Sequence, residues 1–494
     1  MKKSDQELPR YRKVVSLIPG GTMQFLDLGL DIRRLSRVKT EFLEVEVPAF
    51  DNKVNVHLKC MTPSDDGEYY VDTQTGEPVV NPLTGLPDET ITPSYSISIE
   101  KALAPFLNQW VPLPFFRAEG NIGGHEMRYR NGPTDWARVR IEALPEPDRQ
   151  GHTHHLVIAF DTHIQSDIDV TNVSMEEGYA SLAEMDMNDG AELSLVTQFK
   201  SYAWFLNLDW MRDWLRELFY ETLIKKNPKR AIRESDFEHR YEHLARYIAF
   251  IELLGSSDVI PKVKLTDPRR HQDPIDVDLV LDIGNSRTIG MLIEKRPGEN
   301  LSLDNGSVLE LRDLSHPTLT HKETFNSYVC FAKPRFGDPT GYARGSGRYR
   351  PSFSWPSVVR VGAEASRLAV HSRREEGQTS MSSPKRYLWD LKPRVQEWRY
   401  APDPNDPSSP ETPVNSGDFV GFINNEGTPL SAFESRRSKI IEFIQGQSEF
   451  PVTEPKFSRS SMMMFFISEI LSHALVQANS PAQRNNRLNP DIPR

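Results

Sequence analysis

The segment from 278 to 294, DLVLDIGNSRTIGMLIE, restricts the fold more than any other stretch of this sequence. Two apolar runs stand on either side of a short polar turn that contains Gly284, Asn285 and Ser286. Short apolar runs that flank such a turn are typical of a β-hairpin, and glycine lets the backbone bend sharply. The sequence therefore predicts two antiparallel strands, with Asp282 close to the end of the first.

The residues of this turn suit a phosphate group. Successive backbone amides at Gly284, Asn285 and Ser286 form the kind of concavity that binds phosphate oxygens, and the hydroxyls of Ser286 and Thr288 add donors. Asp282 is placed to hold a hydrated magnesium ion. The sequence contains no G-x-x-x-x-G-K-[ST], which excludes a Walker-type site. The alternative is a purely structural hairpin whose Gly and Asn simply favour a turn.

Composition and charge limit the class of protein. The chain has 494 residues, of which 38% are hydrophobic and 26% charged, as in soluble proteins of two to four domains. The net charge of −10 argues against nucleic acid as the main partner. Cys60 and Cys330 are the only cysteines, so we expect two free thiols in a reducing compartment. We therefore predict a cytoplasmic protein.

Neither a secretory signal nor a membrane span is expected. The first ten residues, MKKSDQELPR, have no apolar core behind the lysines. The apolar run 462–476 contains Glu469 and His473 and is short for a bilayer, so we interpret it as part of a buried or amphipathic helix at 459–479.

The first part of the chain is predicted to be rich in strands and to end in helices. VVSLIPGGTMQFLDLGL indicates two strands joined by a Pro-Gly-Gly turn, and further strands are expected at 41–47, 53–60, 136–144 and 154–162. A helical block at 204–224 precedes a helix that begins with a capping box, Ser235 and Glu238, and stops at Gly255. The polar, proline-rich residues 256–276 then indicate a boundary near 275.

Three other stretches are weaker candidates for a site. His152, His154 and His155 lack a further ligand at fixed spacing, which argues against a metal centre. The segment MDMNDG at 185–190 lacks the bidentate glutamate of a calcium loop and is interpreted as a turn. The segment FLDLGL, around Asp27, has no hydroxyl residue after its glycine and is interpreted as an ordinary strand end.

The turn at 282–288 resembles the first phosphate motif of the actin, heat-shock chaperone and sugar-kinase ATPase superfamily. Further along, PSVVRVGAEASRLAV and SSPKRYLWD resemble the early part of the chaperone ATPase lobe, with its Gly-acid-Ala element and its Lys-Arg pair. The family's catalytic lysine follows that element, but Arg367 is the cation here. The positions that match this pattern are Gly362, Glu364, Ala365, Ser366, Arg367, Lys385 and Arg386.

Most of the chain resembles the amino-terminal half of the bacterial virulence factor SrfB family. The resemblance is carried by SLIPGGTMQFLDLGL, LVLDIGNSRT, SWPSVVRVG, SSPKRYLWD and SRSSMMMFFISEILSHALVQANSPAQR. Members of that family are usually about twice as long, so we expect a truncated chain. The resemblance implies a second, Gly-rich phosphate motif and an adenosine motif, which this sequence lacks. We therefore expect residues 1–494 to hydrolyse ATP poorly, and we expect protein partners that neighbouring genes encode.

Together these observations predict an α/β protein of two regions. Residues 1–275 form a sheet-rich α+β region, and residues 276–494 form the start of an actin-like ATPase lobe of ribonuclease-H-like topology. The predicted function is a nucleotide-binding, ATPase-like virulence protein with ATP and magnesium as cofactors. Asp282 and Arg367 are the predicted catalytic residues, with Asp282 also holding magnesium through water. The predicted phosphate contacts are Gly284, Asn285, Ser286, Thr288 and Lys385.

Two other classes remain open. One is a degenerate actin-like scaffold, or a protein-interaction module, that keeps the fold without binding nucleotide. The other is a small-molecule kinase, because type III pantothenate kinases also carry Asp-x-Gly-Asn-Ser/Thr. Their motif stands at the amino terminus of a much shorter chain, and the 275 residues before this turn argue against that class.

Overall fold

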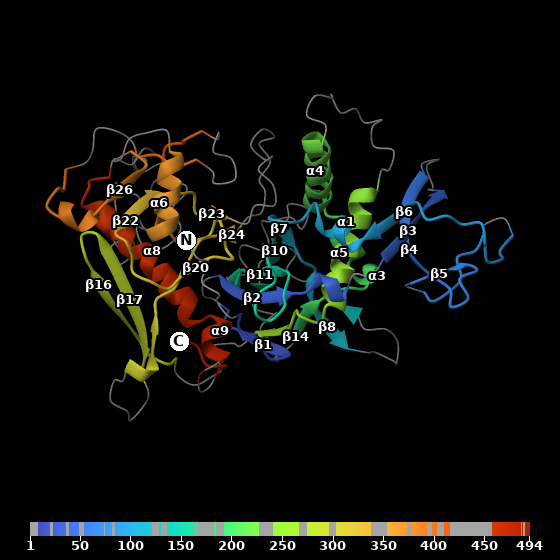
Figure 1. Ribbon diagram of the computed structural model, residues 1–494, viewed down its shortest axis with the longest axis horizontal. Coiled ribbons are helices and arrows are strands. Elements are labelled where there is room, and N and C mark those ends of the chain that lie inside the picture. Colours follow the sequence, from blue (N-terminus) through green and yellow to red (C-terminus); the bar gives the residue numbers. More distant parts are fainter. Residues whose placement is uncertain are drawn as a thin grey trace, which may run out of the picture.

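The computed structural model describes most of the chain. The described residues are 8–19, 23–35, 39–48, 54–73, 75–81, 84–120, 128–129, 136–162, 164–165, 182–183, 192–226, 241–265, 274–295, 303–336, 353–372, 378–392, 398–402, 410–414, 457–485, 487 and 490–494. Within them the protein is a mixed α/β structure of several small sheets and few helices. The earlier part of the chain lies on the right in Figure 1 and the later part on the left.

Three sheets of at least four strands organise the described residues before 266. Their strand orders are β1-β15-β14-β8-β9, β2-β11-β10-β7 and β5-β4-β3-β6, and β12 pairs with β13. The elements are β1 (Val14–Leu17), β2 (Gln24–Leu30), η1 (Ile32–Arg34), β3 (Lys39–Pro48), β4 (Val54–Pro63), β5 (Tyr70–Asp72), β6 (Tyr95–Ser98), α1 (Ile99–Leu103), β7 (Trp110–Pro112), β8 (Phe115–Gly120), β9 (Arg128–Tyr129), β10 (Ala137–Ala143), β11 (His154–Phe160), β12 (Ile164–Gln165), β13 (Leu182–Ala183), β14 (Glu192–Leu195), α3 (Phe199–Leu206), α4 (Asp209–Lys226), α5 (Glu242–Ser256) and β15 (Lys262–Leu265).

The strand predictions for this part are confirmed, but one pairing differs from the expectation. Strands β3 and β4 form an antiparallel pair, and so do β10 and β11. Strands β1 and β2 form where predicted but lie in different sheets, because β1 runs parallel to β15 and β2 pairs with β11. Apolar alternation indicates a strand and its buried face, but it does not reveal the partner strand.

The predicted helices form with different limits. The helical block at 204–224 is two helices, because α3 ends at Leu206 and α4 begins at Asp209, where an acid suits a helix N-terminus. Helix α5 is described from Glu242, since the capping-box residues Ser235 and Glu238 lie outside the described residues. Gly255 lies inside the last turn of α5, where an added Cβ would come within 2.2 Å of Thr197. This glycine therefore permits close packing.

The described residues after 274 form smaller sheets around one long helix. β17 pairs with β16, β18 and β21, β22 lies between β25 and β26, and β19–β20 and β23–β24 form two-stranded pairs. The elements are β16 (Val277–Ile283), β17 (Arg287–Glu294), η5 (Leu303–Asn305), β18 (Gly306–Val308), β19 (Leu311–Arg312), β20 (Thr320–His321), β21 (Phe325–Asn326), β22 (Tyr328–Phe331), β23 (Arg335–Phe336), β24 (Phe353–Ser354), β25 (Val359–Val361), α6 (Gly362–His371), β26 (Ser380–Ser382), η7 (Pro384–Tyr387), α8 (Ser461–Ala478) and α9 (Pro481–Asn485).

Helix α8 confirms the helix predicted at 459–479. It packs against β22 and β25 and runs diagonally through the later part of the chain in Figure 1. In the described part of the chain it alone has the length and apolar composition to cross a membrane, and 67% of it is buried inside the protein. The sequence also predicts a helix near 431–446, and these residues lie outside the described ones.

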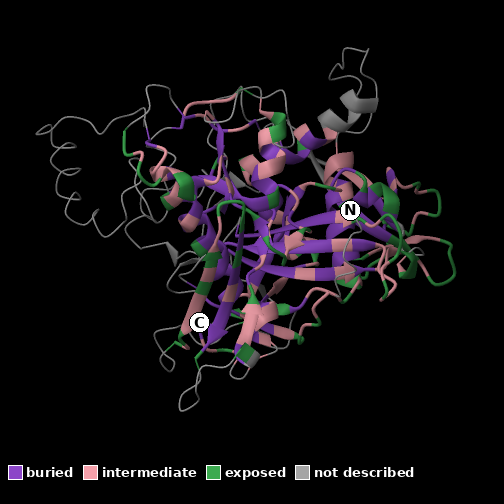
Figure 2. Cartoon of the chain, turned by 60° about the vertical axis from the view of Figure 1, so that its left-hand side comes forward, coloured by how far each residue is buried: buried purple, intermediate pink, exposed green. Residues whose placement is uncertain are grey.

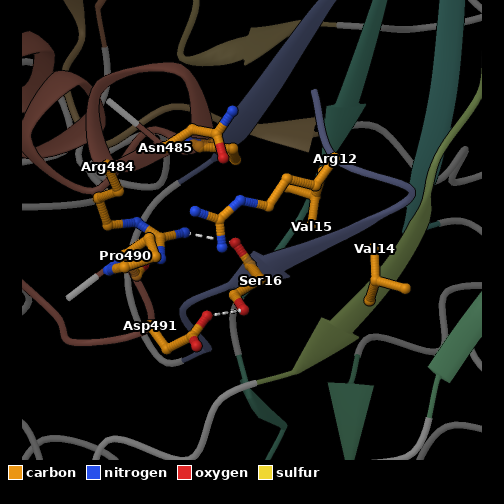
Figure 3. Close-up of a pocket in the computed structure, with 9 residues that line it drawn as sticks. Arg12, Val14, Val15, Ser16, Arg484, Asn485, Pro490 and Asp491 are labelled. Atoms are coloured by element: carbon orange, nitrogen blue, oxygen red, sulfur yellow. Dashed lines mark hydrogen bonds between the residues drawn. The ribbon is translucent and has the colours of Figure 1, made fainter. Parts of the chain in front are cut away.

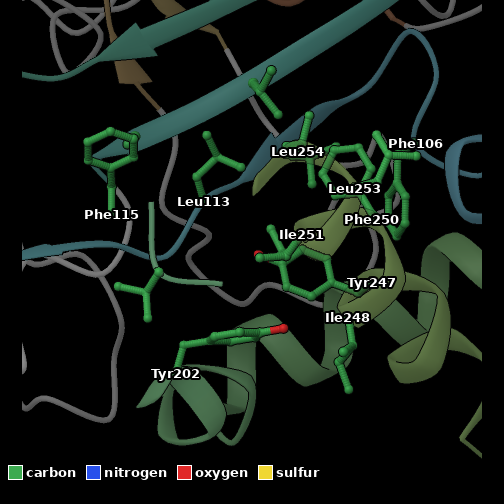
Figure 4. Packing of buried hydrophobic residues seen from close by; sticks show 14 of the residues in the cluster. Phe106, Leu113, Phe115, Tyr202, Tyr247, Ile248, Phe250, Ile251, Leu253 and Leu254 are labelled. Atoms are coloured by element: carbon green, nitrogen blue, oxygen red, sulfur yellow. The ribbon is translucent and has the colours of Figure 1, made fainter. Parts of the chain in front are cut away.

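Each part of the chain has its own apolar core, and a third cluster joins the two parts. In the first core, the ring of Phe106, which follows α1, meets aromatic rings from α4 and α5. Phe106 lies 4.8 Å from Phe250, centroid to centroid, and Figure 4 shows these two rings. The second core gathers around α8. The joining cluster places Phe25 and Trp110 against Phe353 and Trp355. Figure 2 shows how burial runs through the central strands.

An ion pair crosses the same junction. The guanidinium of Arg312 donates to both carboxylate oxygens of Asp27, at 2.9 and 2.7 Å, and lies over the Phe25 ring. Burial would raise the pKa of Asp27, but the charge of Arg312 and a contact with His155 outweigh it and hold the pKa well below its usual range. Asp27 therefore joins the two parts, rather than simply ending a strand.

Buried carboxylates fix helix α6. Glu364 accepts hydrogen bonds from the amides of Leu314 and Ser315, at 3.0 and 3.2 Å. The neighbouring Asp313 carboxylate accepts from Arg367 of the same helix at 2.5 Å. Burial, followed by the charge of Asp313, raises the pKa of Glu364 to about 8. The raised pKa shifts this side chain toward its protonated form near neutral pH.

We predict that Asp27→Ala destabilises the whole chain. The substitution leaves the mostly buried Arg312 without its carboxylate, which typically costs about 3–5 kcal/mol. Chemical denaturation of Asp27→Ala, Arg312→Ala and the double variant measures this cost. The double variant is expected to be much less destabilised than the sum of the single variants. Additive losses would contradict a direct ion pair.

We predict that Glu364 makes the protein less stable as the pH rises from 5 to 8. In this range the folded protein keeps a proton that the unfolded chain, with a pKa near 4.5, has released. The free energy of unfolding of the native chain should therefore fall relative to that of Glu364→Gln, on the order of 3 kcal/mol. Urea denaturation of both proteins at several pH values measures the difference. Parallel pH profiles would show that Glu364 titrates normally.

Candidate functional site

The predicted hairpin forms with a tight turn. β16 and β17 are antiparallel, and Asp282 lies opposite Ile289. The amide of Gly284 donates to the carbonyl of Arg287 at 2.9 Å and closes the turn. An added Cβ on Gly284 would lie 2.6 Å from that carbonyl oxygen. Only glycine therefore allows the backbone to close in this way.

The backbone amides of the turn divide into two kinds. The Gly284 amide, predicted to contact phosphate, is used inside the hairpin instead. Asn285 and Ser286 are exposed, and their amides donate to no group in the described part of the chain. Two of the three predicted amide donors are therefore available to a ligand.

Asp282 and Thr288 lie on opposite faces of the hairpin. Asp282 is exposed, and its carboxylate has no hydrogen bond or ion pair with the residues described. Thr288 is 1% exposed, and its hydroxyl lies 2.9 Å from that of Ser327. Thr288 therefore supports the turn from inside, whereas the sequence predicts a hydroxyl that faces the phosphate.

Ser327 is the main support of the turn, and sequence reasoning missed it. Its hydroxyl donates to the carbonyl of Gly284 at 2.8 Å, and its amide donates to the carbonyl of Ser286 at 2.9 Å. Its own carbonyl accepts from Ser383, which has a left-handed backbone. No motif marks Ser327, which directly follows β21 and is carried to the turn by the pairing of β21 with β17.

Lys385 reaches the same place from a distant part of the sequence. It belongs to η7, is exposed, and donates from Nζ to the carbonyl of Ile283 at 2.8 Å. This contact places an ammonium group at the end of β16, beside the turn. The structure thus brings together two of the predicted site residues, Asp282 and Lys385, in one neighbourhood.

The Gly-acid-Ala element lies at the start of α6 and approaches the turn indirectly. Gly362 has φ +64°, and an added Cβ would lie 3.1 Å from Phe325, so glycine is required there. Asn326, which is opposite Arg287 in the sheet, donates to the hydroxyl of Ser366 at 3.5 Å. The next residue, Arg367, points its guanidinium to Asp313. Its predicted catalytic role stays a prediction.

The structure shows the surroundings of the weaker candidate residues where it describes them. His152 pairs with Asp148 at 2.8 Å, and His155 approaches Asp27 at 3.4 Å. No cluster of three or more His, Cys, Asp or Glu side chains in the described part could hold a metal. Residues 185–190 lie outside the described residues. Cys60 and Cys330 are buried and unpaired.

A small pocket lies between β1 and the end of the chain, and none of the turn residues lines it (Figure 3). Arg484 is its most buried cation and donates to the carbonyls of Asn479, Pro490 and Ser16. Ser16 in turn donates its hydroxyl to Asp491. Because these polar groups bind one another, the pocket joins β1 to the last residues rather than offering a ligand site.

Comparisons with known proteins identify a family and no closer relative. The family model described as virulence factor SrfB matches residues 5–494. No curated protein and no solved structure matches the chain. The actin-like lobe expected for residues 276–494 therefore stays a prediction, while the family match spans nearly the whole sequence. This chain belongs to the SrfB family of virulence factors.

Proposed function

We propose that the turn at 282–288 binds the phosphate groups of a magnesium nucleotide, as the ligand site of an ATPase-like virulence protein. One observation carries the proposal: an exposed turn holds a carboxylate and two amides that donate to no group in the described part of the chain, and an ammonium group contacts the strand end beside it. The amides belong to Asn285 and Ser286, the carboxylate to Asp282 and the ammonium to Lys385.

The donor set fits a magnesium-bound phosphate. Mg²⁺ prefers carboxylate and water oxygens, so Asp282 is the residue that would hold it through water. When bound, the ion supplies positive charge that bridges phosphate oxygens. The amides of Asn285 and Ser286 bind anions without carrying a charge of their own. Lys385 adds a cation whose contact with a neutral carbonyl can be exchanged for a phosphate oxygen.

The rigidity of the turn supports the same proposal. Ser327 binds the carbonyls of Gly284 and Ser286, which fixes the direction of the backbone between them. Donors that are held in place before a ligand arrives lose little conformational entropy when it binds. The support by Ser327 therefore favours a binding role over a flexible loop.

A second candidate is a scaffold that binds no nucleotide. The contacts of Gly284 and Thr288 within the protein favour it, because the hairpin is closed without any ligand. In this case the surface of the second region would contact protein partners instead. The cytoplasmic location and partners encoded by neighbouring genes also stay predictions.

We predict that the protein binds ATP with magnesium and that Asp282→Ala weakens this binding at least about tenfold. Isothermal titration calorimetry with and without magnesium measures the effect, which should require the ion. Asp278→Ala is the matched control, because Asp278 lies on the same face of the same strand and pairs with Lys295 at 2.8 Å. No binding, or equal binding by the native chain and Asp282→Ala, would favour the scaffold.

We also predict that residues 1–494 release phosphate from ATP no faster than a buffer control. Transfer of a phosphoryl group requires hydrogen-bond donors and a metal ion arranged around that group in the transition state. Here Arg367 is held by Asp313, and among the described residues the turn supplies two amides that no protein group uses. A continuous phosphate-release assay tests this. Turnover that Asp282→Ala abolishes would show that the site is complete within this chain.

A further inference from the structure

A short segment after η7 exposes three large apolar side chains. Leu388, Trp389 and Leu391, called the apolar loop here, are 50%, 73% and 73% exposed. None of them belongs to an apolar cluster of the described residues. Single exposed apolar residues are common on soluble proteins, but three within four positions mark an interaction surface.

The backbone of the apolar loop is held in place by the start of α8. Asp390 accepts a hydrogen bond from Arg459 at 2.6 Å, and Arg459 also lies over the ring of Tyr387. Ser460 donates its amide to the carbonyl of Asp390 and its hydroxyl to that of Leu388. The three apolar side chains therefore project from a fixed backbone, which lowers the entropic cost of binding.

The exposed charged side chains within residues 385–392 are positive. Lys385, Arg386 and Lys392 are exposed, whereas Asp390, the one acid within this segment, is paired with Arg459 and mostly covered. The chain as a whole carries a net charge of −10, so this segment stands out from the average surface. An anionic partner complements it.

We propose that the apolar loop binds the surface of an anionic lipid bilayer. Trp389 and Leu391 would enter the interfacial zone, where tryptophan is favoured, while Arg386 and Lys392 lie at the lipid phosphates. Because these side chains are so exposed, they form a protrusion and not the wall of a groove. A lipid surface accommodates any projecting shape, whereas a protein partner requires a matching hollow. This proposal does not depend on nucleotide binding at the turn.

Vesicle sedimentation tests the proposal. The full chain is mixed with vesicles of equal parts phosphatidylcholine and phosphatidylglycerol, or with phosphatidylcholine alone. We expect binding to the mixed vesicles that weakens with added salt, and at least about tenfold weaker binding to the neutral ones. Leu391→Ala should reduce binding about tenfold. Lys392→Glu should also reduce it, through charge.

Leu303→Ala is the matched control, because Leu303 is 74% exposed and lies elsewhere in the sequence. It should bind vesicles as the native chain does. Equal losses in Leu303→Ala and Leu391→Ala would overturn the proposal, since they would indicate unspecific adsorption. Absence of binding to anionic vesicles would also overturn it and would leave a protein as the partner. Unchanged melting temperatures check that the variants are folded.

Tryptophan fluorescence gives an independent measurement. All eight tryptophans of the chain are described, and only Trp389 is exposed. Brominated lipids in the anionic vesicles should therefore quench the Trp389 emission, because bromine quenches only at short range. Trp389→Phe should remove this quenching while the protein still sediments with the vesicles. Quenching that persists in Trp389→Phe would place another face of the protein on the lipid and contradict the proposal.

Discussion

The ion pair between Asp27 and Arg312 is the contact on which the arrangement of the chain depends. It joins a strand of the earlier part to a strand of the later part, beside an apolar cluster to which both parts contribute. A charge taken out of water requires an opposite charge at close range, so each residue restricts where the other can lie. The apolar cluster supplies the driving force, and the pair selects one relative position of the two parts.

In the candidate site, too, apolar burial drives folding while polar contacts select one arrangement. Apolar alternation in β16 and β17 accounts for the hairpin, but polar contacts determine what the turn presents. Ser327 holds two carbonyls of the turn, so that the neighbouring amides of Asn285 and Ser286 stay exposed. The buried hydroxyl of Thr288 belongs to this support. Thr288, which the motif predicts as a ligand contact, thus has a buried structural role.

In helix α6 the residues that match the superfamily's Gly-acid-Ala element have structural contacts of their own. Its glycine has the left-handed backbone that the strand-to-helix junction requires, and its acid, Glu364, is buried with a raised pKa. Arg367 occupies the place of the superfamily's catalytic lysine, yet its charge neutralises Asp313. A cation that is already paired is a weaker candidate for contact with a phosphoryl group, because the pair must break first.

The sequence by itself determined the family, the strand–turn–strand at 278–294, the strand pairs β3–β4 and β10–β11, and helix α8. These features depend on residues that are close in the chain or on patterns that repeat along one element. It did not determine that β1 pairs with β15, that Asp27 meets Arg312, or that Ser327 and Lys385 reach the turn. Those contacts join residues that are distant in the chain and carry no local periodicity. They form only when burial of the shared apolar surface brings the elements together, and for that reason the tertiary structure alone decides them.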